Sequence, residues 1–344
     1  MSLTNGQLAE LLARASEEES GHRRQALQRA SRSAFFWAEE AADVLEAGRS
    51  LTELRSVGPW LAQSITSWLI DPPDPPEPPE VRRGFLTRAE ARATLEAHPE
   101  WLQELRADLQ MHTTYSDGKA SVREMVETAA GYGYEHVAIT DHSKGLKIAR
   151  GMDEAVLSLE GEEIESLNRE LDAAGASIRI VHAIEMNLSP EGEGDMDPEA
   201  LRRLGLVLGA FHSRLRETDD QTERYLRAMR NPDVNVLAHP RGRRFNVRLG
   251  LRAEWDRVFE AAVEEGKALE IDAFPDRQDL DVEMLALARE AGAWISIGTD
   301  AHHPRELSHM EFGVAAAIRA GLPRDRILNF MPREELLAWA SGGS

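Results

Sequence analysis

Short apolar runs alternate with amphipathic segments from residue 105 onward, and this alternation limits the possible folds more than any other feature of the chain. The apolar runs are each long enough for one strand and lie at residues 107–111, 136–140, 179–184, 206–211, 234–238, 268–272 and 294–298. Between them, apolar residues recur at the three- and four-residue spacing typical of helices, for example at residues 121–130, 153–174, 219–229, 254–264 and 282–291. Strand–helix alternation indicates parallel strands. Seven such units in about 240 residues favour a distorted seven-stranded (β/α) barrel of the α/β class over an open sheet.

Residues that can bind metal ions stand at the ends of six of these seven predicted strands. The candidate ligands are Gln110, His112, Asp117, His142, Glu185, His212, His239, Asp300 and His302. Residues two apart in a strand face the same side, which applies to Gln110 and His112. In α/β barrels, functional residues gather at the C-terminal ends of the strands. We therefore predict that the nine residues meet at one end of the barrel and form a metal site.

The kinds of ligand available restrict the chemistry. The chain has no cysteine, which excludes thiolate zinc sites and cysteine nucleophiles. Any metal must be held by imidazole, carboxylate or amide groups. Nine ligands are too many for one tetrahedral ion but suffice for two or three divalent ions, with Glu185 as the natural bridge. Such clusters activate water and stabilise in-line displacement at phosphorus, so phosphoester hydrolysis is the predicted reaction.

The order of these motifs resembles that of a PHP domain, the polymerase and histidinol phosphatase superfamily. The matching segments are DLQMHTTYSDG, ITDH, AIEMN, AFH, LAHP and GTDAH. The resemblance implies a TIM-like distorted barrel with a trinuclear site for Zn, Mn or Fe. The segments TDHSKGLKIARGM, LEIDAFPDRQDL and ISIGTDAHHP further resemble the C-terminal PHP domain of bacterial family X DNA polymerases. Those enzymes begin with a helix-hairpin-helix domain, and their polymerase core lies between it and the PHP domain. Here only a proline-rich spacer and a short helical stretch lie between the N-terminal helical residues and residue 105, so we expect no DNA synthesis.

One residue departs from the family pattern. Gln110 takes the place of the first histidine of the family's His-x-His pair. A neutral amide oxygen is a weaker ligand than imidazole for zinc and suits harder ions. The ion at the end of the site formed by His112, Glu185 and Asp300 is therefore expected to be loosely held, manganese-like or absent.

The chain before residue 105 predicts two further parts. Residues 1–70 have helical patterns, and residues 51–69 resemble a helix-hairpin-helix module, which binds DNA phosphates through backbone N–H groups. Ser56 replaces a glycine of that module, and Trp60 stands where a basic residue is usual. DNA contact and an accessory or dimerising role both remain open for this helical domain. Residues 71–104 form a linker, with the stiff stretch DPPDPPEPPE at its start and a connecting helix at its end, and residues 105–344 form the phosphoesterase domain.

Basic residues follow three of the site strands. They are Lys144, Lys147 and Arg150, then Arg241, Arg243 and Arg244, and finally Arg277. Arginine binds phosphate in a bidentate manner, so Arg241 and Arg277 are expected to hold the substrate. Together with Glu185 and His302 they make up the predicted catalytic residues.

Three functions remain open. The first is a 3′–5′ exonuclease or 3′-phosphatase that acts on DNA ends, with residues 51–69 as the DNA contact. The second is a small-molecule phosphatase of histidinol-phosphate type, and the third is a catalytically weak metal-binding regulatory protein, for which Gln110 is the main argument. The net charge of −20 argues against strong non-specific binding of nucleic acid. No apolar stretch is long enough for a membrane span or a signal peptide, so a cytoplasmic enzyme is expected. The sequence does not fix the oligomeric state.

Overall fold

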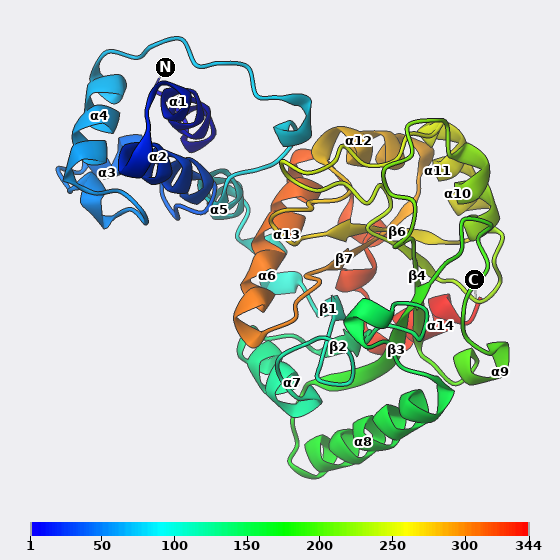
Figure 1. Ribbon diagram of the computed structural model, residues 1–344. Helices are drawn as coiled ribbons and strands as arrows, with labels where there is room; N and C mark the ends of the chain where they lie inside the picture. The colour runs from blue at the N-terminus through cyan, green and yellow to red at the C-terminus, as the bar shows by residue number, and fades with distance from the viewer. Residues whose placement is uncertain (1, 343–344) are drawn as a thin grey trace. The chain divides into compact units, whose positions relative to one another are not determined.

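A computed structural model describes residues 2–342, and the chain divides into two compact units, Met1–His98 and Pro99–Ser344. Figure 1 shows the helices and strands of both units. Within the described residues, no helix has the length and apolar character needed to cross a membrane.

The first unit is all-helical. Its α-helices are α1 (Asn5–Glu18), α2 (Gly21–Ala34), α3 (Ala41–Glu46), α4 (Pro59–Ile70) and α5 (Arg88–Ala97), with 3-10 turns η1 (Leu51–Glu53) and η2 (Glu80–Arg82). Apolar residues spaced three and four apart on α1, among them Leu8 and Leu12, pack with Ile65 of α4 in one core. Of the helix–turn–helix pattern predicted at residues 51–69, only the second helix is a full α-helix. Helix α4 is present, but the residues before the turn form the single short turn η1.

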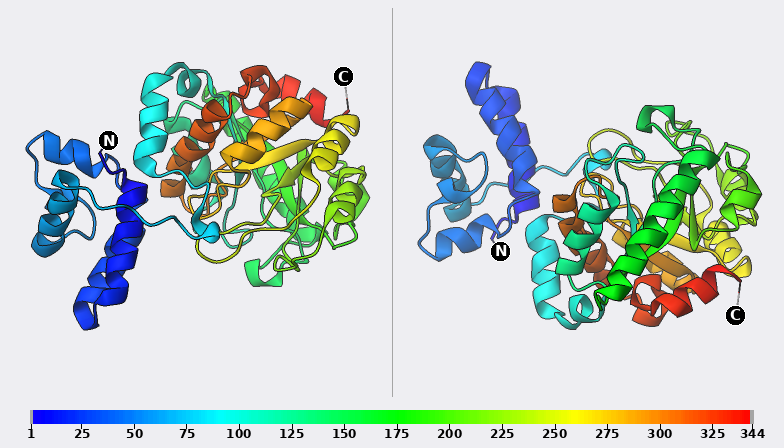
Figure 2. Two further views of the ribbon diagram at one scale, coloured as in Figure 1. Left: turned by 90° about the horizontal axis from the view of Figure 1, so that it is seen from above. Right: turned by 90° about the horizontal axis from the view of Figure 1, so that it is seen from below.

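The second unit contains seven parallel strands in the order β1-β2-β3-β4-β5-β6-β7. The strands are β1 (Ala107–Met111), β2 (His136–Ile139), β3 (Arg179–Asn187), β4 (Leu206–Ala210), β5 (Val236–Ala238), β6 (Ala268–Asp272) and β7 (Trp294–Gly298). The α-helices are α6 (Glu100–Glu104), α7 (Val122–Gly131), α8 (Glu154–Ala173), α9 (Pro198–Leu201), α10 (Thr222–Met229), α11 (Trp255–Glu264), α12 (Val282–Ala291), α13 (Met310–Arg319) and α14 (Arg333–Ala340). The 3-10 turns are η3 (Lys147–Ala149), η4 (Pro304–His309), η5 (Arg324–Arg326) and η6 (Leu328–Phe330). Helices surround the strands, as Figure 2 shows from two sides.

Strands β1 and β7 meet and close the sheet into a barrel. At the C-terminal end of these strands, the His112 N–H donates to the Ala301 carbonyl at 2.8 Å. At the start of β1, the buried Asn329 side chain joins this strand to Ile297 of β7. Its Nδ2 donates to the Ala107 carbonyl at 2.9 Å and to the Ile297 carbonyl at 2.7 Å, and its Oδ1 accepts from the Ile297 N–H at 2.7 Å. The predicted seven-stranded α/β barrel with a small all-α N-terminal domain is thus confirmed.

Strand periodicity decides which residues enter the barrel. Val181 and Ala183 of β3 belong to the interior apolar cluster, and Glu185 continues the same row two residues later. In β1, Ala107 and Leu109 are interior residues. The pairing of β1 with β2 then shifts register between Asp108 and Met111. Since a bulge adds one residue to the strand, the shift carries Gln110 and His112 to the interior side.

Candidate metal centre

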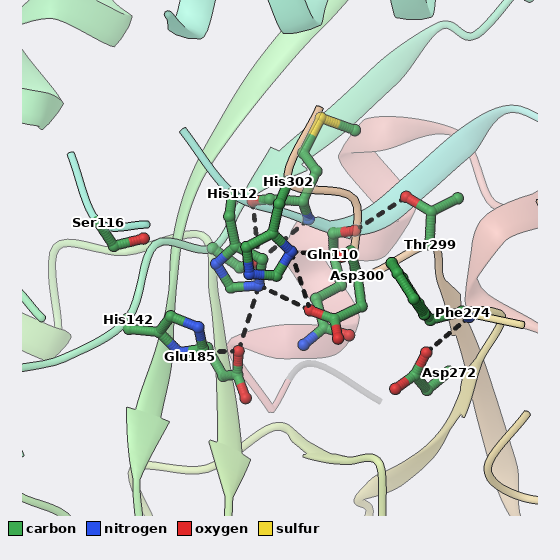
Figure 3. A network of polar contacts seen from close by, with 12 residues as sticks. Gln110, His112, Ser116, His142, Glu185, Asp272, Phe274, Thr299, Asp300 and His302 are labelled. Atoms are coloured by element: carbon green, nitrogen blue, oxygen red, sulfur yellow. Dashed lines mark hydrogen bonds and ion pairs between the residues drawn. The ribbon is translucent and has the colours of Figure 1, made fainter. Parts of the chain in front are cut away.

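Glu185 lies at the middle of the C-terminal end of the barrel, and four histidines surround it. Its Oε2 is 3.3 Å from Nε2 of His112 and 3.1 Å from Nδ1 of His142. Its Oε1 is 3.1 Å from Nε2 of His212 and 2.7 Å from Nε2 of His239. The four histidines come from the ends of four different strands or from the loops that follow them. Figure 3 shows Glu185 between His112 and His142.

Asp117, Asp300 and His302 complete the cluster on one side. Nε2 of His112 is 3.0 Å from Oδ1 of Asp300, and Nε2 of His302 is 3.1 Å from Oδ1 of Asp117. The His112 ring stacks on the rings of His142 and His302, with centroids 4.3 Å and 4.4 Å apart. Three sets of ligand atoms each lie within 4.8 Å of one another: His112, Asp117, His142 and His302; His142, Glu185 and His212; and His112, Glu185 and Asp300. The eight predicted histidine and carboxylate ligands therefore converge, as the strand-end pattern predicts.

Two histidines are oriented by hydrogen bonds on the side away from the cluster. Nδ1 of His302 is 2.7 Å from the Asp300 carbonyl, and Nδ1 of His212 is 3.2 Å from Oδ1 of Asn187. A proton on each Nδ1 leaves the Nε2 lone pair facing the carboxylates. This arrangement is the usual one for histidines that ligate metals.

The unpaired atoms of the cluster fit divalent ions. Both ring nitrogens of His112, Nδ1 of His142 and Oε2 of Glu185 are buried without a well-formed hydrogen bond within the described part of the chain. Buried polar atoms are nearly always hydrogen-bonded, so these atoms need a further partner. Burial alone would raise the pKa of Glu185, but the nearby imidazoles, His142 and His239 first, lower it well below its usual value. Burial lowers the pKa of His142 to about 3, which keeps the imidazole in its neutral, metal-binding form.

Gln110 is fully buried, and neither amide atom has a hydrogen-bond partner among residues 2–342. Figure 3 places its side chain beside Asp300. A Cβ added at Gly298 would lie 2.4 Å from Cβ of Gln110 and 2.5 Å from Oε1 of Glu270. A glycine at position 298 therefore makes room for both side chains. An unpartnered amide at this depth is compatible with a ligand position.

The backbone is strained at two of the candidate ligands. His239 has φ of 29° and Asp300 has φ of 50°, both in the left-handed region that residues with a Cβ rarely adopt. The Glu270 carboxylate fixes the first of these turns, because its Oε2 accepts the His239 N–H at 2.6 Å. Such strain persists where the surroundings determine the conformation, and it is concentrated at functional sites.

Of the two predicted substrate-binding arginines, Arg277 contacts the cluster. Its Nε is 3.3 Å from Oδ2 of Asp300 and 3.4 Å from Oδ2 of Asp272. Arg241 instead donates to Oδ2 of Asp281 at 2.7 Å. Three of the other basic residues also have carboxylate partners: Lys144 pairs with Glu154, Arg243 with Asp281 and Arg244 with Asp276. Lys147 and Arg150 are exposed.

The sequence analysis did not assign roles to Asp141 and Glu270. Oδ1 of Asp141 accepts the backbone N–H groups of Thr113 at 2.8 Å and Ser116 at 3.1 Å, and both hydroxyls also donate to this carboxylate. Asp141 thereby holds the turn that leads to Asp117. The sequence does contain one feature that could have identified both residues. Each is an acidic residue within or directly after an apolar strand, in ITDH for Asp141 and in LEID for Glu270.

The fold and the site define an α/β-barrel protein with a cluster of histidines and carboxylates that can hold divalent ions. Residues 108–273 match the model of the PHP domain. The PolX protein of Bacillus subtilis, named DNA polymerase/3′-5′ exonuclease, is 37% identical over 229 residues, which cover 66% of this chain and 40% of that protein. A probable phosphatase of Tolumonas auensis is 30% identical over 239 residues, which cover 66% of this chain and 91% of that protein. Histidinol phosphate phosphatase of Lactococcus lactis, solved with zinc, L-histidinol and phosphate, has a TM-score of 0.49 and 18% identity, covering 64% of this chain and 95% of that one.

The chain belongs to the PHP domain family. It is a phosphoester hydrolase of the PHP type, which confirms the predicted enzyme class. It spans only about 40% of the length of the PolX relative.

Proposed function

We propose that the clustered residues hold two or three divalent ions, of zinc, manganese or iron, for the hydrolysis of a phosphoester. The observation that carries this proposal is the position of Glu185, whose two oxygens face different pairs of histidines. One carboxylate placed in this way can bridge two ions. When bound, such ions lower the pKa of water toward neutrality and neutralise the charge of a phosphoryl group.

The remaining ligands have distinct positions in this proposal. Asp300 joins His112 and Glu185 at one end of the cluster, where Gln110 takes the place of a histidine. Asp117 and His302 lie on the open side, since their side chains are 32% and 27% exposed while Glu185 is fully buried. Substrate and water therefore reach the cluster from the side of Asp117 and His302.

Arg277 has the role of orienting the substrate. Its guanidinium lies beside Asp300, so it can contact a phosphoryl oxygen at the edge of the cluster without leaving its own ion pair. Arg241 shares Asp281 with Arg243, and it would contact substrate only through a guanidinium nitrogen that this ion pair does not use.

DNA 3′ ends are the substrate that we propose first. The similarity to the PolX protein of Bacillus subtilis, whose name includes a 3′-5′ exonuclease, supports this choice. The second candidate is a small phosphomonoester of histidinol-phosphate type. It is favoured by the probable phosphatase of Tolumonas auensis, because the chain matches 91% of that relative.

The decisive experiment measures metal content and hydrolysis together. The full chain should hold at least two ions per molecule by elemental analysis and should hydrolyse p-nitrophenyl phosphate. Glu185→Gln should lose most of both, whereas the control Glu199→Gln, at an exposed position on α9, should lose neither. Fewer than two ions and no hydrolysis in the unaltered protein would refute the proposal and favour a regulatory protein.

A second comparison separates the two substrates. A 3′-recessed oligonucleotide and histidinol phosphate are supplied to the full chain and to Arg55→Glu, which reverses the one basic residue of 51–69. If this segment contacts DNA, Arg55→Glu should lower kcat/KM for the oligonucleotide and leave p-nitrophenyl phosphate hydrolysis unchanged. Faster hydrolysis of histidinol phosphate than of the oligonucleotide would instead support the small-molecule candidate.

A further inference from the structure

Arginines gather in the loops that follow β4, β5 and β6, next to the metal-ligand cluster. Arg216 follows β4, Arg244 and Arg248 follow β5, and Arg277 follows β6. These loops leave the barrel at the same end as His212 and His239. The chain as a whole has a net charge of −20, so a local concentration of arginine runs against its composition.

Arg244 and Arg248 face each other across a short hairpin. The Arg244 N–H donates to the Arg248 carbonyl at 2.9 Å, and the Arg248 N–H donates to the Arg244 carbonyl at 3.1 Å. Asn246, at the tip, adopts φ of 57°. In such a pair the two side chains stand on the same face of the hairpin, where like charges are destabilising. An unfavourable pair of this kind in an ordered loop indicates a site for an anion.

The hairpin is attached to the loop that carries Arg277. The Phe245 N–H donates to the Asp276 carbonyl at 2.7 Å, and Nε of Arg244 is 2.7 Å from Oδ2 of Asp276. Since Arg277 itself contacts Asp300, positive groups extend continuously from the metal ligands to the hairpin. Their positions are fixed by backbone contacts, which is the preorganisation that phosphate recognition requires.

The positive charges of these four arginines are only partly balanced by carboxylates. Among residues 2–342, Arg216 and Arg248 have no carboxylate within ion-pair distance, and Nε of Arg248 donates to the Gly242 carbonyl. Burial is the main cause that lowers the pKa of the Arg248 guanidinium; the charges of Arg277, Arg244 and Arg216 lower it further, and the Asp279 carboxylate raises it. Arg248 therefore experiences more positive than negative charge from its neighbours.

We propose that Arg244 and Arg248 form a second anion subsite, which binds a phosphoryl group of the substrate other than the one that is hydrolysed. The inference rests on the proposed phosphoesterase function and specifies its substrate class. The substrate carries at least two phosphoryl groups, either as a small bisphosphate or along a phosphodiester chain. Arg277 serves the reacting group, and the hairpin serves the second group.

Three probes that share one reacting group test this assignment. Thymidine 3′-phosphate has no second phosphoryl group, thymidine 3′,5′-bisphosphate has a small one, and the dinucleotide TpTp has a phosphodiester. Arg248→Gln and Arg244→Gln should raise KM about tenfold or more for the second and third probes, because a charge-assisted contact is lost. Neither variant should change the kinetics with thymidine 3′-phosphate. Arg202→Gln, on the exposed turn after α9, is the matched control.

Binding without turnover provides an independent readout. In the full chain with chelator present, titration calorimetry should show tighter binding of the bisphosphate than of the monophosphate, and Arg248→Gln should abolish the difference. Thermal unfolding checks that Arg248→Gln is folded, and Arg244→Gln covers the case in which it is not, since the Arg244 side chain is exposed. Equal losses for all three probes, or no loss in either variant, would overturn the subsite. If no probe is hydrolysed but bisphosphate binding still depends on Arg248, the phosphoesterase proposal fails and the subsite stands. A preference between bisphosphate and TpTp distinguishes a small substrate from a nucleic-acid end.

Discussion

Replacement of Asp141 by alanine measures how strongly the metal-binding turn is held. The Asp141 carboxylate is fully buried and accepts hydrogen bonds from two backbone N–H groups and two hydroxyls of Thr113 and Ser116. The hydroxyls can rotate toward other acceptors in the variant, but the two N–H groups cannot. Each buried N–H left unpaired costs about 1–3 kcal/mol, so the expected loss in the free energy of unfolding is roughly 2–6 kcal/mol.

The neighbouring Glu160 carboxyl does not change this expectation. Burial raises the pKa of Glu160, and the Asp141 charge raises it further, so Glu160 is uncharged at neutral pH and removal of Asp141 relieves no charge repulsion. We take the middle of the range, about 4 kcal/mol, as the expected loss. Asp141→Asn keeps one acceptor oxygen and should lose about half as much.

The measurement combines calorimetry with metal titration. For a domain of this size, about 4 kcal/mol lowers the midpoint of thermal unfolding by roughly 10 °C. Because the turn carries Asp117, metal affinity should also fall by about 10- to 100-fold, as it does when groups behind a ligand are lost. Asp153→Ala is the control, since it removes an exposed helix cap on α8 at a cost of about 1 kcal/mol and should leave metal affinity unchanged. A loss below about 1 kcal/mol for Asp141→Ala, or unchanged metal affinity, would contradict the role assigned to this carboxylate.

Three further predictions concern other parts of the second unit. Asn329→Ala removes the three hydrogen bonds by which this side chain joins β1 to β7 and should lower the free energy of unfolding by about 3–5 kcal/mol. Amide exchange at Ile297 should become faster, and exchange that stays at the wild-type rate would contradict the bridging role. Burial lowers the pKa of His136 to about 4, below its unfolded value, so the unfolded state binds more protons and stability falls as pH decreases from about 6.5 toward 4. His136→Leu should reduce that fall by about 2 kcal/mol between pH 7 and pH 4.5, which thermal unfolding at these two pH values can measure, and an equal fall in both proteins would refute it. Arg277→Lys should lower kcat/KM about tenfold for every phosphoester, with or without a second phosphoryl group; a loss restricted to two-phosphate probes would show that Arg277 belongs to the hairpin subsite instead.

The sequence located the strands because buried parallel strands appear as continuous apolar runs. Their ends were less accurate where polar residues lie inside a strand. The predicted run at 179–184 continues as β3 to Asn187, because Glu185 is paired in the sheet although it is charged. The run at 234–238 is shorter in the structure, where β5 covers only Val236–Ala238.

The directions of the ligands were harder to predict than their identities. His112 faces the interior through the register shift in β1, and His239 has a left-handed backbone that Glu270 supports. Neither feature leaves a local pattern in the sequence. The ion pair of Arg241 with Asp281 is likewise a contact between distant segments. Residue type and position at a strand end therefore predict which residues belong to the cluster. Backbone turns and long-range contacts determine the direction and the partners of each side chain.

The junction of β1 and β7 has a consequence for protein synthesis. These strands come from the two ends of the barrel sequence, and each brings ligands that the other lacks, His112 on one side and Asp300 with His302 on the other. A nascent chain that has not yet emerged from the ribosome beyond residue 302 lacks Asp300 and His302, which two of the three ligand sets require. Those two sets can hold ions only after the whole barrel sequence is present, and a product of premature termination lacks them.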